Sequence, residues 1–328
     1  MPPVFSVLDL SPIIAGSNAA QAFRTSLDLA QHAERWGYRR FWLAEHHGMP
    51  GIASAATAVV IGHIAGGTAT IRVGAGGIML PNHSPLVIAE QFGSLESLHP
   101  GRIDLGLGRA PGSDQMTAHA LRRNLSSDPE EFPRDVQELI GYFRGTQPVR
   151  AIPGLGLSVP IWILGSSVFG AQVAAALGLP FAFASHFAPA HMVQAVGIYR
   201  ARFRPSDQLA RPYVMLGLTV VAADTDDEAR LLATSVQQAF VAVRSGRPMP
   251  LPPPLRGYRE NLDAHGASIL NDVLAYAAIG SAERVRHDIS AFRALTEPDE
   301  LIITSTMFDH AARLRSYEIT AEVRDSLP

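Results

Sequence analysis

The sequence contains no cysteine among its 328 residues. Disulfide bonds, thiolate nucleophiles and sulfur-ligated metal ions are therefore excluded. Charged residues make up only 17% of the chain, the formal net charge is −3, and the basic residues are scattered along it. This balance gives no electrostatic footprint for nucleic acid or for an anionic membrane surface. We therefore expect a cytoplasmic protein that binds neither.

The chain also lacks a recognisable secretory signal and a sustained apolar helix. Its first residues carry no basic region and include Asp9. Residues 151–199 contain no Lys, Arg, Asp or Glu, yet prolines, glycines and a serine pair interrupt every part of this stretch. A membrane span needs about 20 consecutive apolar residues, so this stretch is interpreted as a buried strand, helix and strand.

With 47% hydrophobic residues, the chain has enough apolar side chains for a large core. The stretch from Ile71 to Gly112 shows how that core is organised. Residues 71–80 are apolar and β-prone, residues 86–98 carry apolar side chains at helical spacing, and residues 102–108 resume as a strand. A strand, helix and strand in this order belong to a parallel sheet, whose ligands collect at the carboxyl ends of the strands.

The same alternation continues along the whole chain and predicts eight strands, nearly all of them separated by helices. The predicted strands are 4–10, 39–44, 71–80, 102–108, 161–165, 181–185, 213–222 and 300–304. No shift of composition marks a linker, so a single (β/α)8 TIM barrel over residues 1–328 is favoured over a doubly wound open sheet. The proline-rich segment 244–266 lies between the last two strands and is a candidate lid.

In such a barrel, the carboxyl ends of the strands carry the function. The residues predicted at these ends are Glu45-His46-His47, Gly76-Gly77, Arg109, Ser166-Ser167, His186 and Thr304-Ser305-Thr306. None of these residues shows a metal-ligand spacing such as HExxH, and the adjacent His46 and His47 would point in opposite directions on a strand. We therefore expect no mononuclear metal site.

His46 is the candidate for proton transfer, because imidazole titrates near neutral pH. An isolated histidine is more often a packed rim residue, and only the position of His46 at a strand end favours catalysis. The aromatic residues near the strand ends, Trp42, Trp162 and Phe187, are expected in the core rather than as ring-stacking platforms.

Arg109 and the pair Ser166-Ser167 together indicate an anion site. A guanidinium fixed in a glycine-rich turn can grip a phosphate, although a rim salt bridge to Asp114 is the alternative. Serines between a strand and a helix can complete such a site with the helix N-terminus, although plain helix capping is the alternative. Gly76-Gly77 indicates either a bulge or a place where a flat ligand approaches the backbone closely.

These residues lie in motifs that resemble the bacterial luciferase-like flavin monooxygenases. The resemblance is carried by FWLAEHHGMPG, IRVGAGGIMLPNHSPLVIAEQ, HPGRIDLGLGRAPG, ILGSS and GLPFAFASHF. It covers residues 5–203 well and becomes thin after them. No single motif is specific, but EHH, LPNHSP and GRIDLGLGRAPG in this order are.

The resemblance implies a barrel that binds reduced FMN at its carboxyl face. His46 matches the histidine near the reactive edge of the flavin, Arg109 the arginine that holds the FMN phosphate, and Ser166-Ser167 the segment that completes that cradle. Gly76-Gly77 matches the strand end that often carries a non-proline cis peptide under the ring system. The phosphate would then lie near strands four and five.

Two positions depart from the family pattern. Pro111 stands where a backbone N–H would help to hold the phosphate, and proline has none. Gly170 stands where a second phosphate-binding hydroxyl is expected. Phosphate binding would therefore depend more heavily on Arg109 and Ser167.

The expected function is that of a monooxygenase. A partner flavin reductase supplies reduced FMN, O2 adds at the flavin C4a position, and the hydroperoxide oxygenates a small, largely apolar organic substrate. The alternatives are an FMN- or deazaflavin-dependent reductase or dehydrogenase, and a non-catalytic flavin-binding protein. A homodimer is also expected, because the small-residue helix predicted over 53–66 suits a subunit contact.

Overall fold

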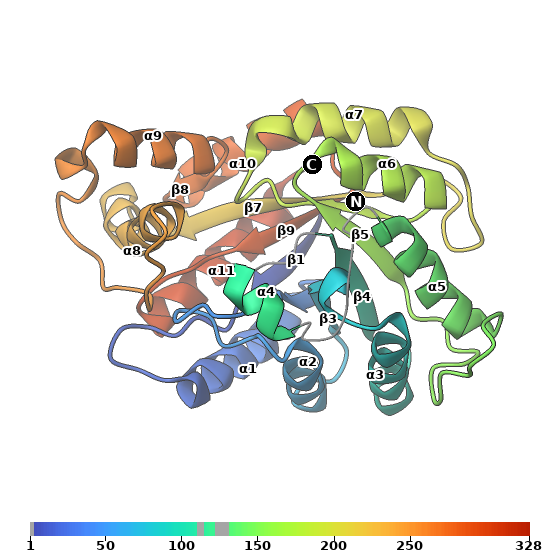
Figure 1. Cartoon of the computed structure of the whole chain (residues 1–328). Helices are drawn as coiled ribbons and strands as arrows, with labels where there is room; N and C mark the ends of the chain where they lie inside the picture. Colours follow the sequence, from blue (N-terminus) through green and yellow to red (C-terminus); the bar gives the residue numbers. More distant parts are fainter. Residues whose placement is uncertain (1–2, 110–114, 122–130) are drawn as a thin grey trace.

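The computed structural model describes residues 3–109, 115–121 and 131–328. Its sheet is a closed, all-parallel barrel surrounded by helices (Figure 1). Closure is shown by the pairing of Phe181 with Val214 at one seam and of Val4 with Glu300 at the other. The predicted TIM-barrel architecture is confirmed, and the open doubly wound sheet is excluded.

The barrel strands are β1 Val4–Asp9, β2 Arg40–Leu43, β3 Arg72–Met79, β4 Ile103–Gly108, β5 Ile161–Gly165, β6 Phe181–Phe183, β7 Val214–Ala222 and β9 Glu300–Thr304. The helices are α1 Ala19–Arg35, α2 Thr57–Gly66, α3 Pro85–Leu98, α4 Gln115–Leu121, α5 Phe132–Arg144, α6 Val168–Leu177, α7 Met192–Arg202, α8 Asp226–Arg244, α9 Ala264–Val273, α10 Ala282–Thr296 and α11 His310–Ser326. Each predicted strand is present, with ends that move by at most two residues.

One strand and one α-helix of the described residues were not predicted from the sequence. The short strand β8, Ala278–Gly280, pairs only with the end of β7 beyond the barrel, at Val220–Ala222. Helix α9 begins at Ala264 and therefore includes the last residues of the segment interpreted as a lid. The rest of that segment, 245–263, contains one short 3-10 helix, η4 Arg259–Asn261.

Side chains alternate along each barrel strand between the surrounding helices and the barrel interior. The outward set, which includes Phe5, Val7, Phe41 and Leu43, belongs to the main core between the strands and helices. The inward set forms a second, separate cluster, namely Leu8, Trp42, Ala44, Trp162, Ala182, Met215 and Ile302. Trp42 and Trp162 meet edge to face at 5.2 Å, as expected for core residues.

Below the tryptophans, a buried ion network closes the amino-terminal end of the barrel. The guanidinium of Arg40 bonds Asp104 at 2.7 Å and Glu300 at 3.0 Å, and so joins β2 to β4 and β9 across the interior. Asp104 also binds Arg72, and Glu300 accepts hydrogen bonds from Ser6 and Tyr213. Because every charge here is paired, the network fills this end without leaving a buried charge unmatched.

Glycines allow the barrel interior to pack this tightly. A Cβ on Gly74 would lie 2.9 Å from Nε1 of Trp42, and one on Gly106 would lie 2.4 Å from Cδ1 of Leu164. The interior is therefore filled at its amino-terminal end, and the carboxyl end remains for function.

Among the described helices, none combines the length and apolar character that a membrane crossing requires. Helix α2 packs on α1, α3, β2 and β3 and leaves Val59 74% exposed. The predicted subunit contact through this helix remains a prediction.

Candidate active site

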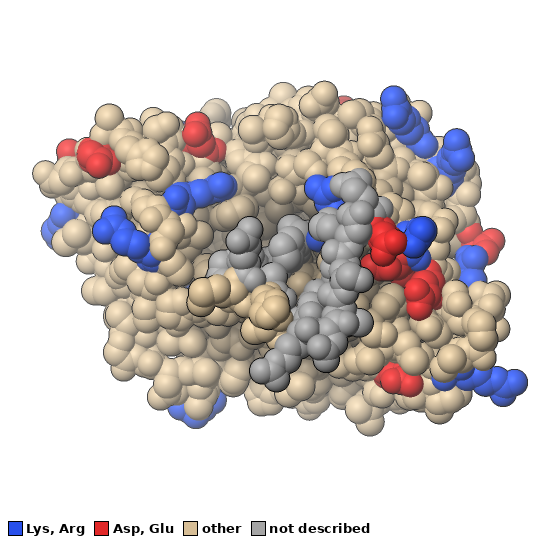
Figure 2. All heavy atoms as spheres, in the orientation of Figure 1, with Lys and Arg blue, Asp and Glu red and all other residues tan. Residues whose placement is uncertain are grey.

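The predicted site residues follow different strands but occur at the same end of the barrel. His46 follows β2, Arg109 follows β4, and Ser166-Ser167 joins β5 to α6. Gly76-Gly77 do not end β3 as predicted but lie within it, at the register shift between Ala75 and Ile78. Since all these strands are parallel, their carboxyl ends form one rim. On the face shown in Figure 2, basic and acidic side chains are spread out rather than gathered in one patch.

Arg109 lies against the first turn of α6. Its guanidinium carbon is 4.1 Å from the ring centroid of Phe169, the second residue of that helix. Such stacking fixes the guanidinium plane next to the positive end of the helix. All 27 basic residues of the chain are arginines, so lysine cannot serve as the phosphate ligand here. Asp114, the alternative partner of Arg109, and Pro111 lie outside the described residues.

Ser167 occupies the N-cap position of α6 with extended backbone angles, φ −147° and ψ 170°. Within the described part of the chain, its side chain makes no capping hydrogen bond, so capping does not account for this serine. Ser166 is exposed and Ser167 is half-buried. Gly170 faces Gly165 and Phe181, where a Cβ would lie 3.4 Å from each, so this position packs the helix against β5.

The peptide bond between Gly76 and Gly77 is cis, as the family resemblance implied. Packing alone excludes a side chain at Gly77 and leaves little room for one at Gly76. A Cβ on Gly76 would lie 3.0 Å from Leu8, and one on Gly77 would lie 2.7 Å from the carbonyl oxygen of Gly106. The two glycines are therefore not independent evidence for a flat ligand.

His186, in the segment after β6, packs over a glycine of β7. Its Nδ1 lies 2.2 Å from the position that a Cβ of Gly217 would occupy. Nδ1 is enclosed and has no hydrogen-bond partner among the described residues. Burial, together with the nearby charge of His46, lowers the pKa of His186 to about 4. The two imidazoles are thus neighbours at the rim, and His186 is neutral at physiological pH.

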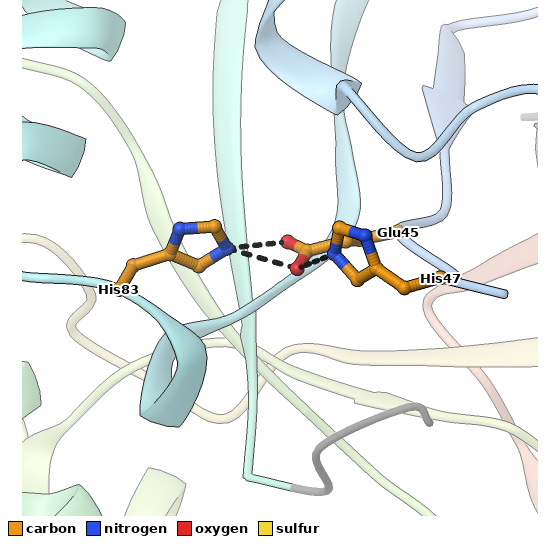
Figure 3. A group of neighbouring side chains, drawn as sticks. All are labelled: Glu45, His47 and His83. Atoms are coloured by element: carbon orange, nitrogen blue, oxygen red, sulfur yellow. Dashed lines mark hydrogen bonds and ion pairs between the residues drawn. The ribbon is translucent and has the colours of Figure 1, made fainter. Parts of the chain in front are cut away.

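Glu45 precedes His46 and forms a cluster with two other histidines. Its carboxylate accepts hydrogen bonds from Nε2 of His47 at 2.7 Å and from Nε2 of His83 at 2.8 Å (Figure 3). Burial by itself raises the pKa of Glu45, but the hydrogen bonds from His83 and His47 outweigh it, and the pKa lies below its usual value. The carboxylate is therefore ionised.

His83 was not among the predicted site residues, and His47 does not lie on a strand as expected. Strand β2 ends at Leu43, so His46 and His47 lie in the connection after it and do not alternate as strand residues. His83 follows a 3-10 helix, η1 Leu80–Asn82, rather than a strand end. The only signal in the sequence was the motif LPNHSP, which the family resemblance used without assigning a role to its histidine.

Other rim residues have structural roles. The backbone N–H of Ser305 donates to the hydroxyl of Tyr317 at 3.0 Å, and its side chain bonds Ser316 at 2.9 Å, so it anchors α11. Phe187 is 37% exposed, which contradicts its expected place in the core. It instead stacks under Arg244, whose guanidinium carbon lies 4.4 Å from the ring centroid.

Comparison with known proteins identifies the family. The profile of the family described as luciferase-like monooxygenase matches residues 4–297. A luciferase-like monooxygenase of Escherichia coli strain K12 is 52% identical over 98% of this chain and 97% of its own length. The N-acetyl-S-alkylcysteine monooxygenase of Bacillus subtilis is 30% identical over 97% of each chain. This chain belongs to the luciferase-like monooxygenase family and is an oxidoreductase.

Solved structures agree with the fold. The crystal structure of apo-MsnO8 matches with a TM-score of 0.88 and 33% identity over 99% of each chain. The oxygenating constituent of 3,6-diketocamphane monooxygenase, solved with FMN, matches with a TM-score of 0.73 at 18% identity, covering 100% of this chain and 99% of that one. An F420-dependent secondary alcohol dehydrogenase matches with a TM-score of 0.71 at 13% identity over 97% and 98%. At such low identity, the last two matches support the fold alone.

The buried His186 gives the stability of the protein a defined pH dependence. The pKa of this group is about 4 in the folded protein and near 6.5 in the unfolded chain, so the unfolded chain binds the proton more tightly. Between these two pH values, stability falls as the pH falls. From pH 7 to pH 5, we expect His186 alone to remove roughly 2 kcal/mol from the free energy of unfolding.

Urea unfolding of the wild type and of His186→Asn at both pH values measures this loss. The variant should lose about 2 kcal/mol less than the wild type, whereas His287→Asn, at an exposed position of α10, should behave like the wild type. Parallel pH dependence of the wild type and His186→Asn would show that His186 is not buried in the neutral form.

Proposed function

We propose that this protein is a two-component monooxygenase that takes reduced FMN from a partner flavin reductase and uses O2 to oxygenate a small, largely apolar organic compound. The observation that carries the proposal is the pairing of Arg109 with the start of α6. A stacked guanidinium, a serine hydroxyl not used for capping and a helix N-terminus meet at one point of the rim. This combination suits a phosphate monoester.

The described residues fit FMN at this rim. Arg109 and Ser167 would hold the phosphate, and the ring system would lie over the rim toward His46. Pro111 has no backbone N–H and Gly170 has no hydroxyl, so the cationic side chain must supply most of the phosphate binding. When bound, reduced FMN would supply the electrons that activate O2.

The two neighbouring imidazoles divide the proton chemistry between them. His46 is half-buried at the rim and is the group that would deliver or remove a proton at the reacting oxygen. His186 stays neutral, so it offers hydrogen bonding without adding a second positive charge next to His46. A site closed to water would limit the loss of activated oxygen as hydrogen peroxide.

Two other functions remain as alternatives. The first is a reductase or dehydrogenase that transfers hydride with FMN or a deazaflavin and without O2. A flavin-binding protein without catalysis would need the same phosphate site. Anaerobic titration of the protein with oxidised and reduced FMN, followed by oxygen uptake after mixing with O2, separates these functions. Tighter binding of reduced FMN and oxygen incorporation support the monooxygenase.

Replacing Arg109 tests the phosphate site. We expect Arg109→Gln to weaken the binding of FMN and reduced FMN at least about tenfold, because it removes a charge-assisted hydrogen bond to the phosphate. Riboflavin lacks the phosphate and should bind both proteins equally. Arg134→Gln, at an exposed position of α5, should bind FMN like the wild type. Equal loss of FMN and riboflavin binding would contradict the role of Arg109 as the phosphate ligand.

Replacing His46 tests the proton transfer. With reduced FMN and a panel of small apolar compounds, transfer of labelled oxygen from O2 should fall at least about a hundredfold in His46→Ala. The affinity for reduced FMN, measured by anaerobic fluorescence titration, should remain within a few-fold of the wild type, since His46 follows β2 and the proposed phosphate ligands follow β4 and β5. Unchanged oxygen transfer in the variant would remove His46 from the catalytic role.

We also propose that residues 244–266 form a cover over the rim. Leu251 pairs with the loop after β1, through hydrogen bonds of 2.8 Å to Ile13 and Ala15. FMN should therefore protect the exposed Arg256 and Arg259 from trypsin, whereas cleavage at the exposed Arg150, in the connection between α5 and β5, should not change. Equal cleavage of the cover with and without FMN, read by mass spectrometry, contradicts a lid.

A further inference from the structure

We propose that Glu45, His47 and His83 form a binding site for one divalent transition-metal ion of the zinc type. One carboxylate oxygen and the two Nε2 atoms all lie within 4.8 Å of one another. The imidazoles approach the carboxylate from opposite sides, as Figure 3 shows. Two histidines and one carboxylate are a ligand set that zinc and iron(II) sites use.

The carboxylate is already prepared as a ligand. Glu45 is 1% exposed and ionised, and its Oε2 accepts the backbone N–H of Met79 at 3.1 Å. A hydrogen bond of this kind fixes the orientation of a metal-binding carboxylate. The two connections that supply the ligands, after β2 and after η1, are thus held in register before any ion binds.

The size of the cluster is close to that of an occupied site. The Nε2 to oxygen distances are 2.7 Å for His47 and 2.8 and 3.0 Å for His83. Ligands on a tetrahedral zinc ion, with bonds near 2.0–2.1 Å, are roughly 3.3 Å apart. Binding therefore needs each histidine Nε2 to move away from the Glu45 oxygen by only about half an ångström.

The ion would take the place of shared protons. An ionised carboxylate only accepts hydrogen bonds, so each Nε2–H now donates a hydrogen bond to Glu45. When the Nε2 lone pair binds the ion, a neutral imidazole carries its proton on Nδ1 instead, whereas an imidazolium keeps Nδ1–H and releases the Nε2 proton to solvent. The side chains of His47 and His83 are 18% and 26% exposed, which leaves a route for the ion and a position for a water ligand.

The site would also affect the proposed active site by position. His47 is the neighbour of His46 in the chain, so an ion at this cluster would tie the segment that carries His46 to the η1 turn. The inference does not depend on flavin binding, because none of its three ligands belongs to the proposed phosphate site.

Calorimetric titration of the chelator-treated protein with Zn2+ in the absence of flavin tests the proposal. The wild type should bind one ion per chain, and His83→Gln and His47→Gln should each bind it at least about tenfold more weakly. His265→Gln, at an exposed position of α9, is the matched control and should bind like the wild type. Mg2+, which prefers oxygen ligands, should not compete.

Spectroscopy with Co2+ gives a second readout of the same ligands. Bound Co2+ should show the intense visible absorption of a four- or five-coordinate ion in the wild type and lose it in both histidine variants. Circular dichroism and urea unfolding establish that the variants are folded. Absence of saturable Zn2+ binding, or binding that survives both replacements, overturns the proposal and leaves the proposed monooxygenase function untouched.

Discussion

The ion pairs of Arg40 with Asp104 and Glu300 fix the positions of the strands on which the rest of the barrel interior and its carboxyl rim depend. It joins three strands across the interior and fills the end that carries no function. Arg40 also lies 4.9 Å from the ring centroid of Trp162, and Nε1 of Trp42 donates to Asp104 at 3.2 Å. The two tryptophans therefore pack directly against the ion network and fill the barrel interior between that network and the carboxyl rim.

Burial of this network is costly unless every charge is paired, since removal of one partner leaves an isolated charge in a medium of low polarity. Its geometry therefore specifies the relative positions of β2, β4 and β9. These strands position His46 and Arg109 directly, because each residue follows closely after the end of its strand. The ion pairs at the amino-terminal end of the barrel therefore help to set the positions of the polar groups at the carboxyl rim.

The barrel could be predicted from the sequence because parallel strands are apolar on both faces and helices separate them. The rim residues could be predicted for the same reason, since topology alone gathers the ends of parallel strands. Strand β8 could not be predicted, because it has only three residues, which pair with the end of β7 outside the barrel and carry no periodic pattern. Proline content led to the interpretation of 244–266 as irregular and concealed the start of α9.

The histidines of the rim show where sequence reasoning ends. His83 comes close to Glu45 only because η1 turns the chain back after β3. No local pattern in LPNHSP indicates that its histidine approaches Glu45. The burial of Nδ1 of His186 depends on a glycine in a different strand, Gly217, whose missing side chain leaves the space. Contacts of this kind depend on tertiary packing, so no pattern within a single segment predicts them.

The pairing of Leu251 with Ile13 and Ala15 has a mechanical consequence. The loop after β1 also receives Gly51, through a 3.0 Å hydrogen bond from Ile13, and Gly51 belongs to the connection that carries His46. If residues 249–251 swing outward, these interlocked loops lose their shared anchor. An opening movement of the proposed cover would therefore also change the support of the connection that carries His46.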